Sequence, residues 1–163
     1  FMFGDCMSIF ARSVFDPSGN SPLRMRSRIN RGTPERPGLV FAMLPGGSCH
    51  GVAYRVPRRR AAAEMERLWA REMPNAVYDP RWLPCRTAKG EIRALGFTLS
   101  RSSPNFIATL ADRELIHILE HARGRFGTTL DYLVETAEAL QRRGLRDREI
   151  ERMVALAREH ALL

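Results

Sequence analysis

Residues 57–99 read PRRRAAAEMERLWAREMPNAVYDPRWLPCRTAKGEIRALGFTL, and this stretch decides the class of fold. Pro57 can open a helix, because the first helical turn does not need the N–H group that proline lacks. Apolar residues then recur at helical spacing until Pro74 ends the pattern. They are Ala61, Met65, Leu68 and Trp69. The pattern predicts one helix between Pro57 and Met73.

Two predicted strands follow this helix, at residues 82–87 and 91–99. Ala88-Lys89-Gly90 between them is a turn sequence, so the two strands are expected to form an antiparallel hairpin. Together with further strands before it and helices in the last third of the chain, this hairpin indicates an α+β fold.

The residues before this stretch predict further strands. A short strand is expected within 1–8, a weakly alternating one at 24–30 and a buried one at 39–44. Residues 45–48, Pro-Gly-Gly-Ser, form a turn sequence that leads into a strand at 50–56. This order predicts that 39–44 and 50–56 pair as an antiparallel hairpin.

Three helices are predicted after residue 105, and each has its own start or stop signal. Thr109 with Asp112, and Thr128 with Asp131, resemble capping boxes, and Asp147 can cap the last helix. Gly124 and Gly144 are suited to end the first two helices. The last helix has a buried stripe of Ile150, Met153, Val154 and Ala157. The sequence therefore predicts one α+β domain over 1–163, with an antiparallel sheet or barrel and mostly C-terminal helices.

The 163 residues fall in the usual size range of one domain, which can fold without disulfides or metal. Cys6, Cys49 and Cys85 are scattered and form no metal-binding pattern, which favours a reducing, cytoplasmic environment. The longest apolar run, 39–44, is too short to span a membrane. The first residues lack the basic region of a signal peptide.

The formal net charge of +8 raises the possibility of nucleic-acid binding. Lys89 is the single lysine, and the remaining cations are arginines spread along the chain. The densest runs, 58–60 and 142–143, have no interleaved aromatic residues that could stack on bases. We therefore expect solvated helix ends there, and a nucleic-acid-binding module is the most distant of the alternatives.

Glu72 is a carboxylate in an unusual place. It continues the apolar stripe of the predicted helix, close to the C-terminal end, where the helix dipole disfavours negative charge. Partial burial and the dipole would both raise its pKa, which suits a group that accepts and returns a proton. The competing interpretation is a helix-end glutamate that reaches solvent or pairs with Arg71 or Arg81.

Four segments resemble the ChaC-like γ-glutamyl cyclotransferases in order and spacing, and the match extends from about Arg31 to the C-terminus. They are RGTPERPGLV at 31–40, GVAYRV at 51–56, LWAREM at 68–73 and YDPRWLP at 78–84. The resemblance implies a compact barrel with flanking helices, no metal or organic cofactor, and cleavage of glutathione or a related γ-glutamyl amide to 5-oxoproline and an amine such as Cys-Gly.

The resemblance also implies roles for particular residues. Glu72, in the Arg-Glu pair of the motif, matches the family's catalytic acid/base. Tyr78 is expected to line the substrate pocket, unless it is a core aromatic. Arg31 and Gly32 either shape that pocket or have a structural role in a turn.

The substrate carboxylate would be bound by the residues that align with the family's Gly-Tyr-Gly-Ser-Leu loop, which are Gly4, Asp5, Cys6, Met7 and Ser8. The tyrosine and the second glycine of that loop are missing here, and Asp5 adds a negative charge. A catalytically inactive relative that keeps the fold is therefore the main alternative to an enzyme.

The segment His117-Ile-Leu-Glu-His121 fits the H-x-x-E-H pattern of a class of zinc peptidases. Both histidines lie beside the apolar face of their predicted helix, toward Arg113 and Glu114. A five-residue pattern of this kind arises easily by chance, so we expect a solvated helix face and no metal site.

Overall fold

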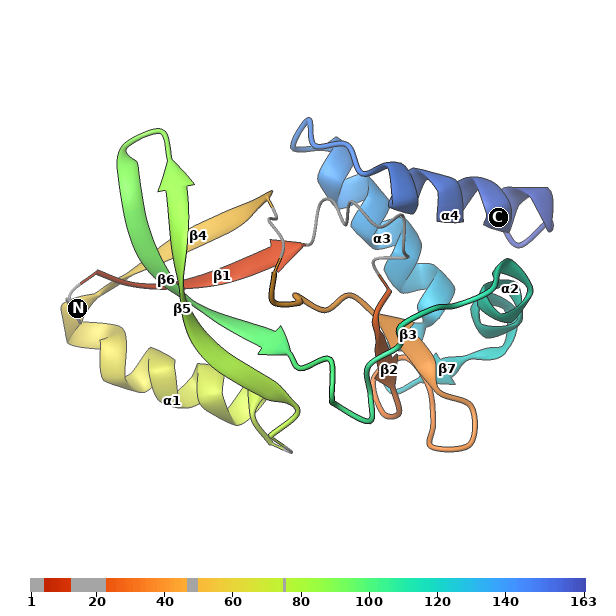
Figure 1. Ribbon diagram of the computed structural model, residues 1–163, viewed down its shortest axis with the longest axis horizontal. Coiled ribbons are helices and arrows are strands. Elements are labelled where there is room, and N and C mark those ends of the chain that lie inside the picture. Colours follow the sequence, from red (N-terminus) through yellow and green to blue (C-terminus); the bar gives the residue numbers. More distant parts are fainter. Residues whose placement is uncertain (1–4, 13–22, 47–49, 75) are drawn as a thin grey trace. The chain divides into compact units, whose positions relative to one another are not determined.

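The computed structural model describes residues 5–12, 23–46, 50–74 and 76–163. The chain divides into two compact units (Figure 1). The first consists of residues 1–13 and 43–103, and the second of residues 14–42 and 104–163. The expectation of one domain over 1–163 stays a prediction, and each unit is described by itself.

The first unit is a four-stranded mixed sheet with one helix (Figure 1). The strand order is β4-β1-β6-β5, with a parallel contact between β1 and β6 and antiparallel pairs elsewhere. The elements are β1 (Asp5–Arg12), β4 (His50–Pro57), a 3₁₀ turn (Arg58–Arg60), α1 (Ala61–Glu72), β5 (Tyr78–Thr87) and β6 (Gly90–Leu99). The α+β expectation is confirmed, and the strands of the described residues form no closed barrel.

The β5–β6 hairpin forms where the sequence predicts it, although β5 starts earlier, at Tyr78. Gly90 closes the turn at φ +112°, a conformation that glycine adopts without steric cost. The Thr87 hydroxyl accepts from the Lys89 N–H at 3.1 Å and donates to the Gly90 carbonyl at 2.9 Å. These local bonds explain why a sequence pattern suffices to predict this hairpin.

The predicted hairpin between 39–44 and 50–56 is wrong. β3 (Gly38–Val40) pairs with β2 (Met25–Ser27), and β4 pairs with β1. After β3 the chain crosses into the first unit, where the Leu99 N–H donates to the Met43 carbonyl at 2.8 Å. A turn sequence predicts a change of direction but not the partner of a strand, which depends on long-range contacts.

The second unit packs three helices with two short two-stranded sheets, β2–β3 and β7–β8. Its other elements are α2 (Asp112–His121), β7 (Arg123–Gly124), β8 (Gly127–Thr128), α3 (Thr129–Gln141) and α4 (Arg148–Glu159). Leu23 and Leu39 join fully buried side chains of the helices in one core. The predicted stripe of α4 is confirmed for Ile150, Met153 and Ala157, whereas Val154 is partly exposed.

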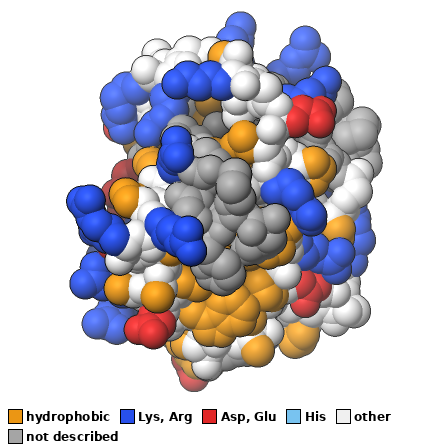
Figure 2. Space-filling model, turned by 90° about the vertical axis from the view of Figure 1, so that its left-hand side faces the viewer, with side chains coloured by type: hydrophobic (Ala, Val, Ile, Leu, Met, Phe, Trp, Pro, Cys, Tyr) orange, Lys and Arg blue, Asp and Glu red, His pale blue; other side chains and the backbone are white. Residues whose placement is uncertain are grey.

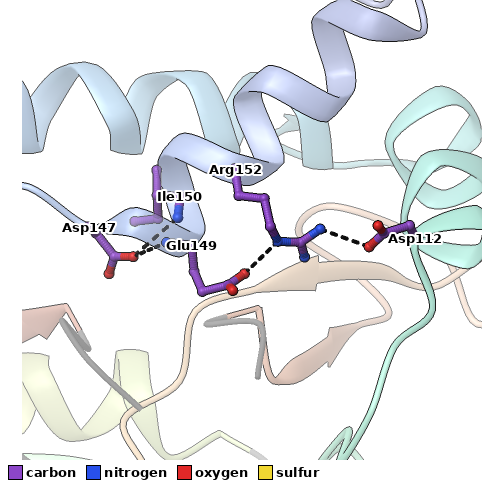
Figure 3. Close-up of polar contacts among 5 residues, drawn as sticks. All are labelled: Asp112, Asp147, Glu149, Ile150 and Arg152. Carbon is purple, nitrogen blue, oxygen red and sulfur yellow. Dashed lines mark hydrogen bonds and ion pairs between the residues drawn. The ribbon is translucent and has the colours of Figure 1, made fainter. Parts of the chain in front are cut away.

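Two of the three predicted helix caps are confirmed. The Thr128 hydroxyl and the Asp131 carboxylate each accept the other residue's backbone N–H at 2.9 Å, which is a complete capping box for α3. Asp147 accepts from the N–H groups of Glu149 and Ile150 at 3.0 and 3.1 Å (Figure 3). The predicted box of Thr109 with Asp112 is wrong, because α2 begins after Ala111 without a side-chain cap.

Asp112 instead takes part in a link between two helices. Arg152 of α4 binds the Asp112 carboxylate of α2 at 2.8 Å and the Glu149 carboxylate of its own helix at 3.0 Å (Figure 3). Asp112 thus still helps to place α2, through a partner forty residues away that no local pattern reveals.

Candidate functional site

Glu72 is the last residue of α1. The N–H of Met73 still makes a helical bond to the Trp69 carbonyl at 2.8 Å, but Met73 itself leaves helical geometry at φ −115° and ψ 22°, and Pro74 follows. The Glu72 side chain is only 20% exposed. The partial burial expected from the apolar stripe is therefore present, at the helix end where carbonyl groups point outward.

Arg71 is the ionic partner of this carboxylate. Its Nε atom lies 2.8 Å, and its Nη2 atom 2.6 Å, from Oε1 of Glu72. Arg81, the other arginine considered from the sequence, lies 3.6 Å from Asp79. The pairing of Glu72 with Arg71, considered from the sequence as the alternative to a catalytic role, is thus present. The carboxylate in this pair is half-buried.

An aromatic contact fixes the last turn of α1 on the sheet. The rings of Trp69 and Phe97 meet edge to face, with centroids 6.2 Å apart. Phe97 pairs with Pro80 in the hairpin, and Leu99 pairs with Tyr78. The end of α1 and the start of β5 therefore share one end of the β5–β6 hairpin. Trp69 belongs to the apolar stripe predicted from the helical spacing, yet it is 45% exposed.

Tyr78 is the first residue of β5, and its side chain is half-buried. Strand β5 is antiparallel to β6, so Tyr78 lies at the same end of the hairpin as the α1 contact to Phe97. The structure thus places Tyr78 and Glu72 at one end of the first unit, with five residues of chain between them. A pocket-lining role for Tyr78 stays a prediction.

The residues aligned with the carboxylate-binding loop lie mostly in a strand. Gly4 falls outside the described residues, whereas Asp5, Cys6, Met7 and Ser8 form the first half of β1 and pair with β4. Ser8 also pairs with Leu95 of β6. The expectation of a loop is wrong for 5–8, because the neighbouring strands hold this backbone extended. Substrate binding by these residues stays a prediction.

Arg31 belongs to the second unit, where its side chain contacts two residues of α3 and the residue that caps this helix. Its side chain is 14% exposed and lies 3.3 Å from both the Thr128 carbonyl and the Glu135 carboxylate. The guanidinium carbon also lies 5.1 Å from the centre of the Tyr132 ring, within the range of a cation–π contact. These contacts support the structural role considered from the sequence.

Gly32 is buried where three backbone segments meet. A Cβ atom there would lie 2.6 Å from the Arg36 carbonyl oxygen, and one on Gly124 would lie 2.5 Å from the Asn30 carbonyl carbon. Only glycine permits such close packing of main chains. Arg31 and Gly32 therefore both have a structural role in the second unit. That they also shape a substrate pocket stays a prediction.

The other side chains with reactive potential are placed less favourably. His117 and His121 are exposed, and their rings stack at 4.4 Å. The described residues contain no group of three or more potential metal ligands. Cys85 is a free thiol whose pKa is raised by burial, which disfavours the nucleophilic thiolate. Glu72 is thus the best-placed acid/base among the residues that the sequence singled out.

No helix of the described residues is long and apolar enough to cross a membrane.

Comparison with known proteins identifies the family. The model of the ChaC-like proteins matches residues 21–160. The glutathione-specific γ-glutamylcyclotransferase of Escherichia coli is 30% identical over 76% of this chain and 54% of its own length. The enzyme of the same name from Schizosaccharomyces pombe is 27% identical over 72% of this chain. The chain spans 54% and 66% of the lengths of these two relatives.

Solved structures agree on the fold. A crystal structure of the γ-glutamyl cyclotransferase specific to glutathione from yeast superposes with a TM-score of 0.72, covering 96% of this chain and 99% of that one at 14% identity. The selenomethionine form of the yeast protein gives a TM-score of 0.68 and covers 85% of that chain. With a family model that matches 140 of its 163 residues, this chain belongs to the family of ChaC-like proteins.

Proposed function

We propose that this protein is a γ-glutamyl cyclotransferase that converts glutathione to 5-oxoproline and Cys-Gly. The observation that carries the proposal is the half-buried Glu72 carboxylate at the end of α1. It lies in the LWAREM segment, which resembles the family's catalytic motif. The names of the relatives from Escherichia coli and Schizosaccharomyces pombe support glutathione as substrate.

The reaction needs one group that accepts a proton and gives it back. Glu72 takes a proton from the α-ammonium group of the substrate, and the free amine attacks the γ-carbonyl carbon. A carbon–nitrogen bond forms and closes the five-membered ring. The bond from the same carbon to the cysteine nitrogen then breaks, as Glu72 returns the proton to that nitrogen. The ring nitrogen passes its remaining extra proton to the freed amine, so 5-oxoproline leaves with a neutral lactam N–H and Cys-Gly with an ammonium group. No water is consumed and no cofactor takes part.

Intramolecular attack explains why so few groups suffice. The nucleophile and the carbonyl belong to one molecule, so holding the γ-glutamyl group in a bent conformation supplies much of the acceleration. Tyr78, at the same end of the hairpin as the last turn of α1, is a candidate for holding that group. Asp5–Ser8 are candidates for the carboxylate contacts through their backbone.

Two further points support a glutathione enzyme of the cytoplasm over a nucleic-acid-binding protein. Cys85 is a free thiol, as expected in a reducing compartment. On the face drawn in Figure 2, hydrophobic, acidic and other side chains of the described residues lie between many of the Lys and Arg side chains. A nucleic-acid-binding surface usually gathers its Lys and Arg side chains in one patch or stripe.

The first experiment is turnover of reduced glutathione, followed by quantifying 5-oxoproline and Cys-Gly. Glu72→Gln should lower the rate by about 10²–10⁴-fold, the usual contribution of a general acid/base. Glu66→Gln is the matched control, since Glu66 is an exposed residue of the same helix and its variant should remain active. Glutathione acetylated on its α-amine should not react, because the attacking nitrogen is blocked. An active Glu72→Gln variant would refute the assignment.

A catalytically silent relative is the second candidate function. It is favoured by the Asp5-Cys6-Met7 sequence, which replaces the family's Tyr and second Gly, and by the strand conformation of these residues. If a well-folded preparation turns over neither glutathione nor other γ-glutamyl amides, this candidate replaces the enzyme.

A further inference from the structure

Glu72 and Arg71 form an ion pair that ordinary helix geometry does not produce. Side chains at positions i and i+1 of a helix point about 100° apart, and neighbours on one face are three or four residues apart. The positions three and four residues before Glu72 are Trp69 and Leu68, which carry no charge. The Arg71 guanidinium therefore has to fold sideways across the last turn to reach the carboxylate.

Other ion pairs of this helix follow the usual spacing. Arg60 and Arg67 contact the Glu64 carboxylate from four residues before it and three residues after it, at 2.6 and 3.5 Å. The Arg71–Glu72 pair differs in burial as well, because a 56% exposed guanidinium meets a 20% exposed carboxylate. The contact thus joins the solvent side of the helix to its half-buried side, where Glu72 lies.

The contacts also distinguish the two carboxylate oxygens. Both Nε and Nη2 of Arg71 lie within 2.8 Å of the same atom, Oε1. Within the part of the chain that the structure describes, no hydrogen bond or ion pair ends on Oε2 of Glu72. One oxygen of the carboxylate is held by two donors from a planar fork, while the described residues supply no donor to the other.

We propose that Arg71 is a positioning residue for the reaction, and that by holding Oε1 it presents Oε2 of Glu72 as the oxygen that exchanges the proton with substrate. This inference rests on the proposed function and specifies how its site is oriented. In the proposed step, Oε2 takes the proton from the α-ammonium group and returns it to the leaving cysteine nitrogen. Arg71 exchanges no proton itself.

Positioning predicts a particular kinetic pattern. Arg71→Met removes both donors from an exposed side chain, so the fold should persist, and kcat should fall by about 10²-fold, the scale for a misplaced reacting group. KM should change by less than about 3-fold, because Arg71 does not touch substrate in this scheme. Arg71→Lys keeps the charge and a donor group but not the planar fork, and kcat should then be within about 10-fold of the parent value.

Arg67→Met is the matched control. Arg67 is 74% exposed, lies on the same helix and pairs with Glu64, so its loss should leave kcat unchanged. A merely structural role of Arg71 would instead change the melting temperature and kcat together in Arg71→Met. Equal kcat values for Arg71→Met and the parent, with Glu72→Gln inactive, would overturn this inference and leave the proposed function standing.

A measurement without turnover tests the contact itself. The proton on Nε of Arg71, observed by NMR in the whole protein, should shift downfield relative to exposed arginines and should move toward them in Glu72→Gln. An unchanged signal in that variant would overturn the inference whether or not the protein is active. Absence of turnover in the parent would refute the proposed function, and the positioning role in catalysis with it.

Discussion

Replacing Gly32 by alanine should disrupt the close packing of three main-chain segments in the second unit and destabilise the fold. A Cβ atom at this position would lie 2.6 Å from the Arg36 carbonyl oxygen, 2.7 Å from the Pro37 carbonyl carbon and closer still to the Gly38 nitrogen. All three atoms belong to backbone, so no side-chain rotation can make room.

The loss of folding stability follows from these distances. Ordinary contact needs more than 3 Å, so the Gly38 nitrogen, the nearest of these atoms, must move by about 1 Å. That segment leads directly into Leu39, whose side chain is fully buried and whose N–H donates to the Thr129 hydroxyl at 3.0 Å. Overpacking of this kind costs about 3 kcal/mol. At about 2–4 °C per kcal/mol for a chain of this size, the melting temperature should fall by about 6–12 °C.

Thermal unfolding followed by circular dichroism measures the change. Gly144→Ala is the matched control: its Cβ would meet no atom within 4 Å, and only the φ of +64° opposes it. That variant should lose about 1 kcal/mol, or about 2–4 °C. If Gly32→Ala melts within about 2 °C of the parent, the packing argument fails. A stable but inactive Gly32→Ala variant would instead favour the substrate role expected from the family resemblance.

Two carboxylates should make opposite contributions to stability as pH changes. Backbone hydrogen bonding in the capping box of α3 lowers the pKa of Asp131, so its contribution is present at neutral pH and is lost as pH falls through the folded pKa. The stability deficit of Asp131→Asn in urea titrations should therefore shrink in acid, and a constant deficit would contradict this. Burial raises the pKa of Asp147, so its charged form costs stability that is recovered as pH falls. Asp147→Asn keeps the capping oxygen and should be at least as stable as the parent at neutral pH, whereas Asp147→Ala should lose about 1 kcal/mol; equal stability of the two variants would exclude the cap.

The sequence predicted elements whose stabilising contacts are local. The α3 capping box, the Asp147 cap and the hairpin closed at Gly90 all depend on residues within four positions of each other. The sequence failed where partners are distant. The turn at 45–48 predicted that 50–56 pairs with 39–44, although β4 pairs with β1. The spacing of Thr109 and Asp112 predicted a helix cap, although the Asp112 carboxylate binds Arg152.

The candidate site shows the same division. The apolar period of α1 was enough to single out Glu72 as a carboxylate on a partly buried face, and the side chain is 20% exposed. Its sideways pair with Arg71 was one of several alternatives, because helical spacing alone gives no reason to prefer an i, i+1 contact. The contact of Trp69 with Phe97 could not be foreseen, since it requires the register of the hairpin.

The sequence by itself thus determined the family, the α+β class, the local caps and turns, and the residue on which the proposed chemistry depends. Tertiary structure alone decided the strand order β4-β1-β6-β5, the strand conformation of Asp5–Ser8 and the burial of Gly32 among three backbones. The physical reason is the range of the interactions. Periodicity and capping act over a few residues, whereas strand partners and backbone packing depend on which distant segments the folded core brings together.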